Sequence, residues 1–114
     1  MKKESINSQV VEALRICEID KEYKRKEIIK IVVDFCGCNI SSVMPSDYCY
    51  NRVNKDINYE KSIHLFLYLE RNRYKYCGPN FSYTGPIYHK PIGSKGDIIV
   101  GRLENGILVE PINI

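Results

Sequence analysis

The sequence has no tryptophan and only two methionines among its 114 residues. It also has no uninterrupted run of about 18 apolar residues, the length that a membrane-spanning helix requires. The first residues, MKKESINSQ, are charged and polar and lack the apolar stretch of a secretory leader. These absences predict a protein without a membrane-spanning segment and with a cytoplasmic location.

Paired cysteine motifs are missing as well. The chain has five cysteines, and an odd number in a protein without a leader predicts reduced thiols rather than a disulfide framework. Cys36-Gly37-Cys38 does not have the CxxC spacing of a structural zinc site, and His64 and His89 are isolated in the sequence. We therefore expect buried, reduced cysteines and neither a metal nor another cofactor.

Sequence signatures of catalysis are also absent. There is no G-x-x-x-x-G-K-[ST] phosphate loop, no G-x-S-x-G nucleophile elbow and no H-N-H constellation. Glu22-Tyr23-Lys24 matches a nuclease ExK motif only as a fragment, since it is expected at the start of a helix and not on a strand. The sequence therefore predicts a protein that is not an enzyme.

The composition is that of one ordinary globular domain, residues 1–114, with 44% hydrophobic and 27% charged residues. The formal net charge is only +3, but the charges are unevenly distributed. Residues 71–96 contain Arg71, Arg73, Lys75, Lys90 and Lys95 and no acidic residue. This distribution indicates one basic face.

Apolar residues recur at helical spacing in the N-terminal half and predict helices over about 5–18, 24–35 and 41–54. Gly37 is a suitable left-handed residue after the second helix. Ser41 or Ser42 can cap the third helix, and Pro45 is tolerated there because the first turn has no amide to lose from the hydrogen-bond ladder.

The pattern changes in the C-terminal half. Residues 64–77 and 97–110 alternate or run apolar around short polar turns, and Asn105-Gly106 is a strong hairpin signal. Two β-hairpins are therefore predicted, although residues 60–69 also fit a helix. The predicted fold class is α+β: three helices, a hairpin and an additional C-terminal hairpin.

Three helices followed by a hairpin is the order of a winged helix-turn-helix. In this interpretation residues 41–54 form the recognition helix and residues 64–77 form the wing, with Arg71 and Arg73 at its tip. Serines near a helix start can donate to phosphates, and Asn and Arg can pair with adenine and guanine edges. The predicted double-stranded-DNA-binding residues are Ser42, Ser46, Tyr50, Asn51, Arg52, Asn54, Lys55, Arg71, Arg73, Lys75 and Lys90.

The segments KEYKRKEIIKIVVDF, NISSVMPSDYCYNRVN, LFLYLERNRYKYCGPNFSYTGPIYHKP and VGRLENG together resemble a poorly characterised group of small bacterial and phage domains. PSDYCYN and YTGPIYHKP are the most specific pieces, and the resemblance covers roughly residues 20–106. Such domains occur alone or beside restriction-type nucleases and are described as winged-helix-like. The resemblance implies nucleic-acid-associated work in regulation, defence or counter-defence, and it implies no catalytic role.

Other interpretations stay open at this point. Serines and asparagines also form turns, and the cations of residues 71–75 also suit a solvated hairpin tip. The chain also has the size of a phage-encoded, anti-CRISPR-like inhibitor that binds a host nucleic-acid-guided nuclease. A homodimer through residues 5–18 is compatible with the pattern. Finally, Pro79, Phe81, Tyr83 and Tyr88 are candidates for an aromatic cage around a flipped base.

Overall fold

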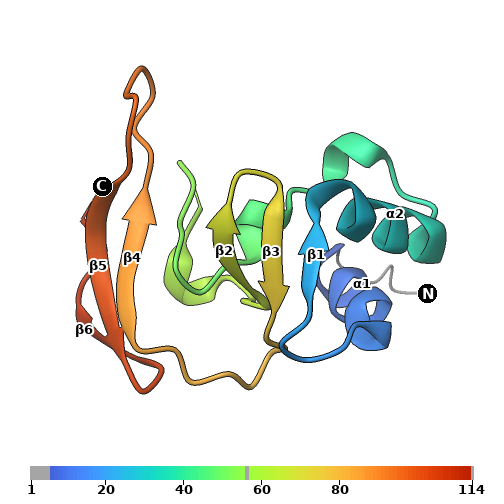
Figure 1. The fold of residues 1–114 in the computed structure, drawn as a ribbon, viewed down its shortest axis with the longest axis horizontal. Coiled ribbons are helices and arrows are strands. Elements are labelled where there is room, and N and C mark those ends of the chain that lie inside the picture. Colours follow the sequence, from blue (N-terminus) through green and yellow to red (C-terminus); the bar gives the residue numbers. More distant parts are fainter. Residues whose placement is uncertain (1–5, 56, 114) are drawn as a thin grey trace.

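The computed structural model describes residues 6–55 and 57–113, and of Ile6, Asn7 and Ser42 it describes the backbone alone. In this part the chain forms two three-stranded antiparallel sheets that stand side by side, with α1 and α2 next to the first sheet (Figure 1). The helices are α1 (Ile6–Ala13) and α2 (Arg25–Cys36), with the 3₁₀ turns η1 (Leu14–Ile16), η2 (Ile40–Ser42), η3 (Pro45–Tyr48) and η4 (Tyr59–Lys61). The strands are β1 (Glu22–Lys24), β2 (Phe66–Glu70), β3 (Arg73–Tyr76), β4 (Gly85–His89), β5 (Ile98–Glu104) and β6 (Ile107–Glu110).

Helix α2 confirms the second predicted helix. At its start the Lys24 N–H donates to Glu27 Oε1 at 2.8 Å, which satisfies an amide that has no partner within the helix. At its end Gly37 takes a left-handed conformation with φ 66°, and its N–H donates to the Val33 carbonyl at 2.8 Å. The inward face of α2 carries Ile28, Ile29 and Val32.

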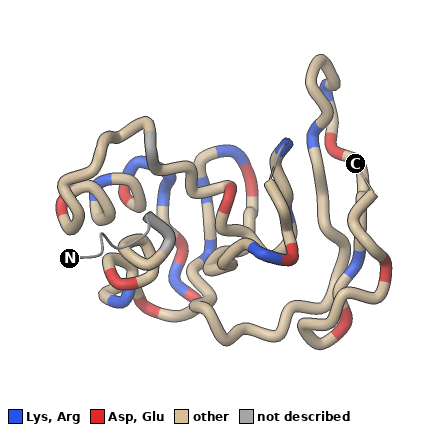
Figure 2. Tube along the Cα trace, turned by 180° about the vertical axis from the view of Figure 1, so that it is seen from behind, with Lys and Arg blue, Asp and Glu red and all other residues tan. Residues whose placement is uncertain are grey.

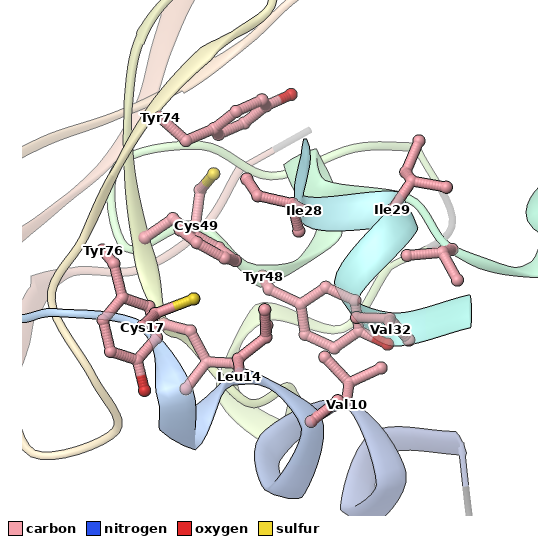
Figure 3. Packing of buried hydrophobic residues seen from close by; sticks show 14 residues of the cluster. Val10, Leu14, Cys17, Ile28, Ile29, Val32, Tyr48, Cys49, Tyr74 and Tyr76 are labelled. Atoms are coloured by element: carbon pink, nitrogen blue, oxygen red, sulfur yellow. The ribbon is translucent and has the colours of Figure 1, made fainter. Parts of the chain in front are cut away.

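The main core lies between the two helices and the first sheet. Figure 3 shows Val10 and Leu14 of the N-terminal helical segment directed toward Val32 of α2 and toward Tyr48. On the sheet side the core is closed by Phe66, whose ring meets Tyr74 and Tyr76 in edge-to-face contacts at 5.9 and 5.6 Å. This core holds most of the buried apolar residues of the chain.

The predicted hairpins form, but the first one is not a wing. β2 and β3 turn at Arg71-Asn72, where Asn72 has φ 67°, and β5 and β6 turn at Asn105-Gly106. β3 is the central strand of its sheet because it also pairs with β1, in the order β1-β3-β2. The helical alternative for residues 60–69 is wrong, since residues 66–70 are strand β2.

The prediction of a winged helix-turn-helix is also wrong. The described chain has two short helices and two antiparallel sheets, and no helix forms over residues 41–54. Met44 is extended (φ −118°) ahead of Pro45, as expected for a residue that precedes proline. Farther along this segment, the consecutive residues Tyr48, Cys49 and Tyr50 are all buried. A surface helix cannot bury three consecutive side chains, whereas an extended segment enclosed on both sides can.

That extended segment joins the two sheets. We call residues 49–53 the bridging segment; it lies between β2 and β4 in Figure 1. Parallel bridges link Cys49 to Phe66 and Arg52 to Tyr88. On the first side the Tyr50 N–H donates to the Phe66 carbonyl at 2.8 Å. On the second side the Tyr88 N–H donates to the Asn51 carbonyl at 2.9 Å, and the Val53 N–H donates to the Tyr88 carbonyl at 2.9 Å.

The side chain of Asn51 completes the bridge. Its Oδ1 accepts the Tyr68 N–H at 2.8 Å and its Nδ2 donates to the Tyr68 carbonyl at 2.9 Å. The amide thereby satisfies both backbone groups of a strand residue, as a neighbouring strand would. A smaller second core of Val53, Tyr59, Ile87, Val100 and Leu103 joins the bridging segment and η4 to the second sheet.

The cysteine prediction is partly wrong. Cys36 and Cys38 are disulfide-bonded across Gly37, whereas Cys17, Cys49 and Cys77 are free and buried. The positive φ of Gly37 turns the chain so that the two cysteine Cα atoms lie 5.3 Å apart. Neither described helix is long and apolar enough to cross a membrane.

Candidate functional site

Three adjoining hollows lie at the end of the molecule where the β2–β3 turn and the β4–β5 loop project. One of about 490 Å³ is lined by Arg52, Tyr68, Arg71, Lys90, Lys95, Gly96 and Asp97. The second, of about 350 Å³, is lined by Arg25, Ser46, Arg52, Asn54, Tyr68, Arg71, Asn72 and Tyr74. A third, of about 330 Å³, is lined by Lys24, Arg25, Lys26 and Asn72. Because neighbouring hollows share residues, we treat them as one surface and call it the basic groove.

Arg52 is the best-fixed side chain of the basic groove. The bridging segment carries it, and only 11% of its side chain is exposed. Its guanidinium pairs with Asp97 at 3.2 Å and lies over the Tyr68 ring, 4.4 Å from the ring centroid. A partly buried cation needs such partners, because burial without them costs several kcal/mol. Arg52 is therefore held in place at the centre of the groove.

The other groove cations have no carboxylate partner. Within the described part of the chain Arg25, Arg71, Lys90 and Lys95 form no ion pair, and Asp97 is the one carboxylate among the lining residues. Figure 2 shows blue segments at the β2–β3 turn and in the β4–β5 loop, at the same end of the molecule. Unpaired cations around a concave surface raise the local positive potential and attract anions.

Five predicted site residues line the groove: Ser46, Arg52, Asn54, Arg71 and Lys90. The reason differs from the predicted one, because no recognition helix presents them. The Asn54 side chain donates to Ser46 Oγ at 2.8 Å and to Asp47 Oδ1 at 2.7 Å. Ser46 and Asn54 therefore hold each other, and they shape the groove wall instead of offering an unused base-reading edge.

Tyr50 and Asn51 are not surface-reading residues. Tyr50 is buried and its hydroxyl donates to the Gly78 carbonyl, while Asn51 is committed to Tyr68. Lys55 is exposed at the end of the bridge and lines none of the three hollows. The side chain of Ser42 lies outside the described atoms.

Arg73 and Lys75 are likewise outside the groove. Arg73 pairs with Glu22 and with Glu70, and Lys75 pairs with Asp20 at 3.6 Å. Both cations lie on the central strand β3. Because each of them pairs with a neighbouring carboxylate, their charge is balanced there and is not directed to a ligand in the groove.

The sequence interpretation missed Arg25, Tyr68 and Lys95. Lys95 belongs to the acid-free stretch of residues 71–96, so its charge was visible in the sequence, but nothing there placed it beside Arg52. Tyr68 stands in an apolar run and was predicted only as a strand residue. Arg25 begins α2, and no local signal brings it next to residues 71 and 72.

The free cysteines do not form a nucleophilic site. Burial raises the pKa of Cys17, Cys49 and Cys77 above the usual thiol value, so each stays protonated at neutral pH. No group of three or more His, Cys, Asp or Glu side chains is placed to hold a metal ion in the ranges 6–55 and 57–113.

Comparison with known proteins places the chain without giving it an activity. A family profile described as a domain of unknown function (DUF7225) matches residues 5–110. The "Uncharacterized protein YnaC" of Bacillus subtilis (strain 168) is 41% identical over 103 residues, which make up 90% of this chain and 38% of that protein. The chain thus spans less than half the length of this relative. No solved structure matches the chain.

Proposed function

The chain belongs to the family of DUF7225 domains, and we propose that it is a nucleic-acid-binding protein that holds the phosphates of a single strand in the basic groove. The observation that carries the proposal is the convergence of cations from separate segments on one concave surface. Arg25 comes from α2, Arg52 from the bridging segment, Arg71 from the β2–β3 turn, and Lys90 and Lys95 from the β4–β5 loop.

An extended polyanion fits this surface better than a small anion does. The cations are distributed along three adjoining hollows, from Lys24 and Lys26 at one end to Lys95 at the other. A chain of phosphates can contact them in succession, and each contact releases condensed counterions and so contributes to affinity.

A single strand is favoured over a duplex. The described chain presents no recognition helix, and apart from Arg25 and Lys26 at the start of α2 the groove residues belong to strands, turns and loops. The Tyr68 ring lines both of the larger hollows, where an unpaired base can stack beside the Arg52 guanidinium. Such binding tolerates many sequences, because every base has a π-face.

Fluorescence anisotropy with a labelled single-stranded oligonucleotide tests the proposal, with a duplex of the same sequence as a second arm. The double variant Arg71→Ala with Lys90→Ala should bind at least tenfold more weakly at low salt. Its log K against log salt should be less steep by about 1.4, because two phosphate contacts are lost. The control Arg15→Ala with Lys30→Ala removes the same charge from η1 and α2, where each cation pairs with a local carboxylate.

Equal binding by the two double variants would overturn the proposal, as would no binding by the unmodified protein at low salt. Tighter binding of the duplex would overturn the single-strand preference. Inhibition of a host nuclease stays a prediction, and a regulatory or defence role does too. A protein that imitates nucleic acid presents carboxylates, whereas the groove presents cations.

A further inference from the structure

A separate pocket of about 250 Å³ lies at the end of the molecule opposite the basic groove. There the β5–β6 turn approaches the segment that follows β3. Its walls carry four rings, those of Tyr50, Tyr59, His64 and Phe81, and the second sheet adds Leu103 and Leu108. We call it the aromatic pocket. Of the residues that the sequence suggested for an aromatic cage, Phe81 lines this pocket, whereas Pro79, Tyr83 and Tyr88 do not.

The rings are held by one another and by the backbone. Tyr59 and His64 stack with centroids 4.1 Å apart, and Tyr50 meets Phe81 edge-to-face at 5.3 Å. The Tyr59 hydroxyl donates to the Tyr50 carbonyl at 2.6 Å, and the Tyr50 hydroxyl donates to the Gly78 carbonyl. Since both hydroxyls are engaged, these walls offer ring surface to a ligand and not hydroxyl groups.

The rim supplies one charged group. Glu60 lines the pocket, is exposed and forms no ion pair within the described part of the chain. Ser62 also lines the pocket, but its hydroxyl already donates to the Asn58 carbonyl at 2.6 Å. The pocket therefore combines aromatic walls with one free carboxylate that accepts hydrogen bonds.

From this combination we infer that the aromatic pocket binds a guanine base. Guanine is flat, so it can stack on the rings, and its adjacent N1–H and N2–H groups can donate to the two oxygens of Glu60. The pocket volume of about 250 Å³ far exceeds the roughly 10–15 Å³ of cavity that a single water molecule needs. That volume suits a bicyclic base and exceeds what a trimethylammonium group, the usual ligand of an aromatic cage, would fill.

This inference does not rest on the proposed function of the basic groove. No lining residue of the aromatic pocket lines the groove, so either site can be removed alone. The guanine can come from a free nucleotide or from an unstacked base of a strand. A guanine-containing oligonucleotide that binds more tightly than a guanine-free one of the same length, with the difference lost in Glu60→Gln, identifies the strand as the source. Equal binding of the two oligonucleotides identifies the free nucleotide.

Isothermal titration calorimetry with guanosine, adenosine and choline tests the inference. Guanosine should bind more tightly than adenosine, and choline should not bind. Glu60→Gln should weaken guanosine binding about tenfold while changing adenosine binding little, because only guanine offers two adjacent donors to the carboxylate. Glu18→Gln is the matched control, since Glu18 is an exposed carboxylate beside β1 and far along the chain from the pocket.

A second variant tests the stacking wall. Phe81→Ala should weaken guanosine and adenosine binding alike, by about tenfold, since stacking does not discriminate between the bases. Phe35→Ala, which removes an exposed ring from α2, should leave both affinities unchanged. Choline binding, equal guanosine affinities of Glu60→Gln and the unmodified protein, or no nucleoside binding at millimolar concentration would overturn the inference.

Discussion

The two sheets differ in what covers them. The first sheet packs against α1 and α2 around a large core, with Phe66 and Tyr74 on its inner face. In the part of the chain that the structure describes, no α-helix lies beside the second sheet and its core has five buried residues; Ile107 of β6 is 67% exposed. Apolar burial is the main source of stability. The first sheet is therefore stabilised by its own core with the helices, whereas the second sheet depends for its stability on the bridging segment.

Substitutions in the first core should have the largest effect. Phe66→Ala removes a fully buried ring from β2, next to Tyr74 and Tyr76. We expect the free energy of unfolding to fall by about 3–5 kcal/mol, from lost transfer free energy and the cavity left behind. Urea unfolding measures the fall, and Phe35→Ala on the exposed face of α2 is the control. A loss below 1 kcal/mol by this assay would contradict the assignment of Phe66 to the core.

Loss of the Asn51 side-chain hydrogen bonds should destabilise the second sheet more than the first. Asn51→Ala leaves the Tyr68 N–H and carbonyl without their partner, at a cost of about 1–3 kcal/mol for each group that stays buried. The loss should act more on the second sheet, because the first sheet keeps its large core with the helices, whereas the second sheet has a small core and joins the first through the bridging segment. Hydrogen exchange should therefore accelerate in β4 and β5 more than in β3. Asn80→Ala, which replaces an exposed asparagine outside the bridging segment, serves as the control.

Uniform acceleration in all strands would show that the two sheets unfold as one unit. In that case the second sheet would not depend on the bridging segment more than the first sheet does, and the difference between the halves would lie in their surfaces alone.

A smaller effect is expected from His64 at acid pH. Burial lowers the pKa of His64 below its ordinary value of 6.5. The unfolded chain therefore takes up this proton first as the pH falls through 6.5, and the folded state loses stability below that pH. One proton gives a slope of at most about 1.4 kcal/mol per pH unit. Thermal unfolding of His64→Gln between pH 7 and pH 5 should show a shallower decline than that of the unmodified protein; parallel curves would exclude this role.

Local signals predicted individual elements but not the fold. The helix from residue 25 to Gly37 and both hairpin turns follow from residues that are neighbours in the sequence, such as Asn105 and Gly106. The bridging segment had no such signal, because its partners Tyr68 and Tyr88 lie far along the chain. Its polar residues Asn51 and Arg52 suggested a surface helix, whereas one replaces a strand partner and the other pairs with Asp97.

The candidate site was also predictable only in part, because its arrangement depends on partners far apart in the sequence. The acid-free stretch contains Arg71 and Lys90, which line the basic groove. It also contains Arg73 and Lys75, whose carboxylate partners come from β1, β2 and the residues before β1. Charge composition reveals the sign of a surface, and long-range pairing decides which of its cations stay free.

The most direct test of the basic groove is the effect of removing its one carboxylate. Asp97→Asn keeps an oxygen that can accept a hydrogen bond from the Arg52 guanidinium and increases the positive charge of the groove by one. Binding of a single-stranded oligonucleotide should tighten about fivefold at 0.1 M salt, the effect of one additional phosphate contact. Glu110→Gln makes the same change in net charge at the end of β6, outside the groove. Tightening by Asp97→Asn alone would support the groove, and equal effects of the two variants would contradict it.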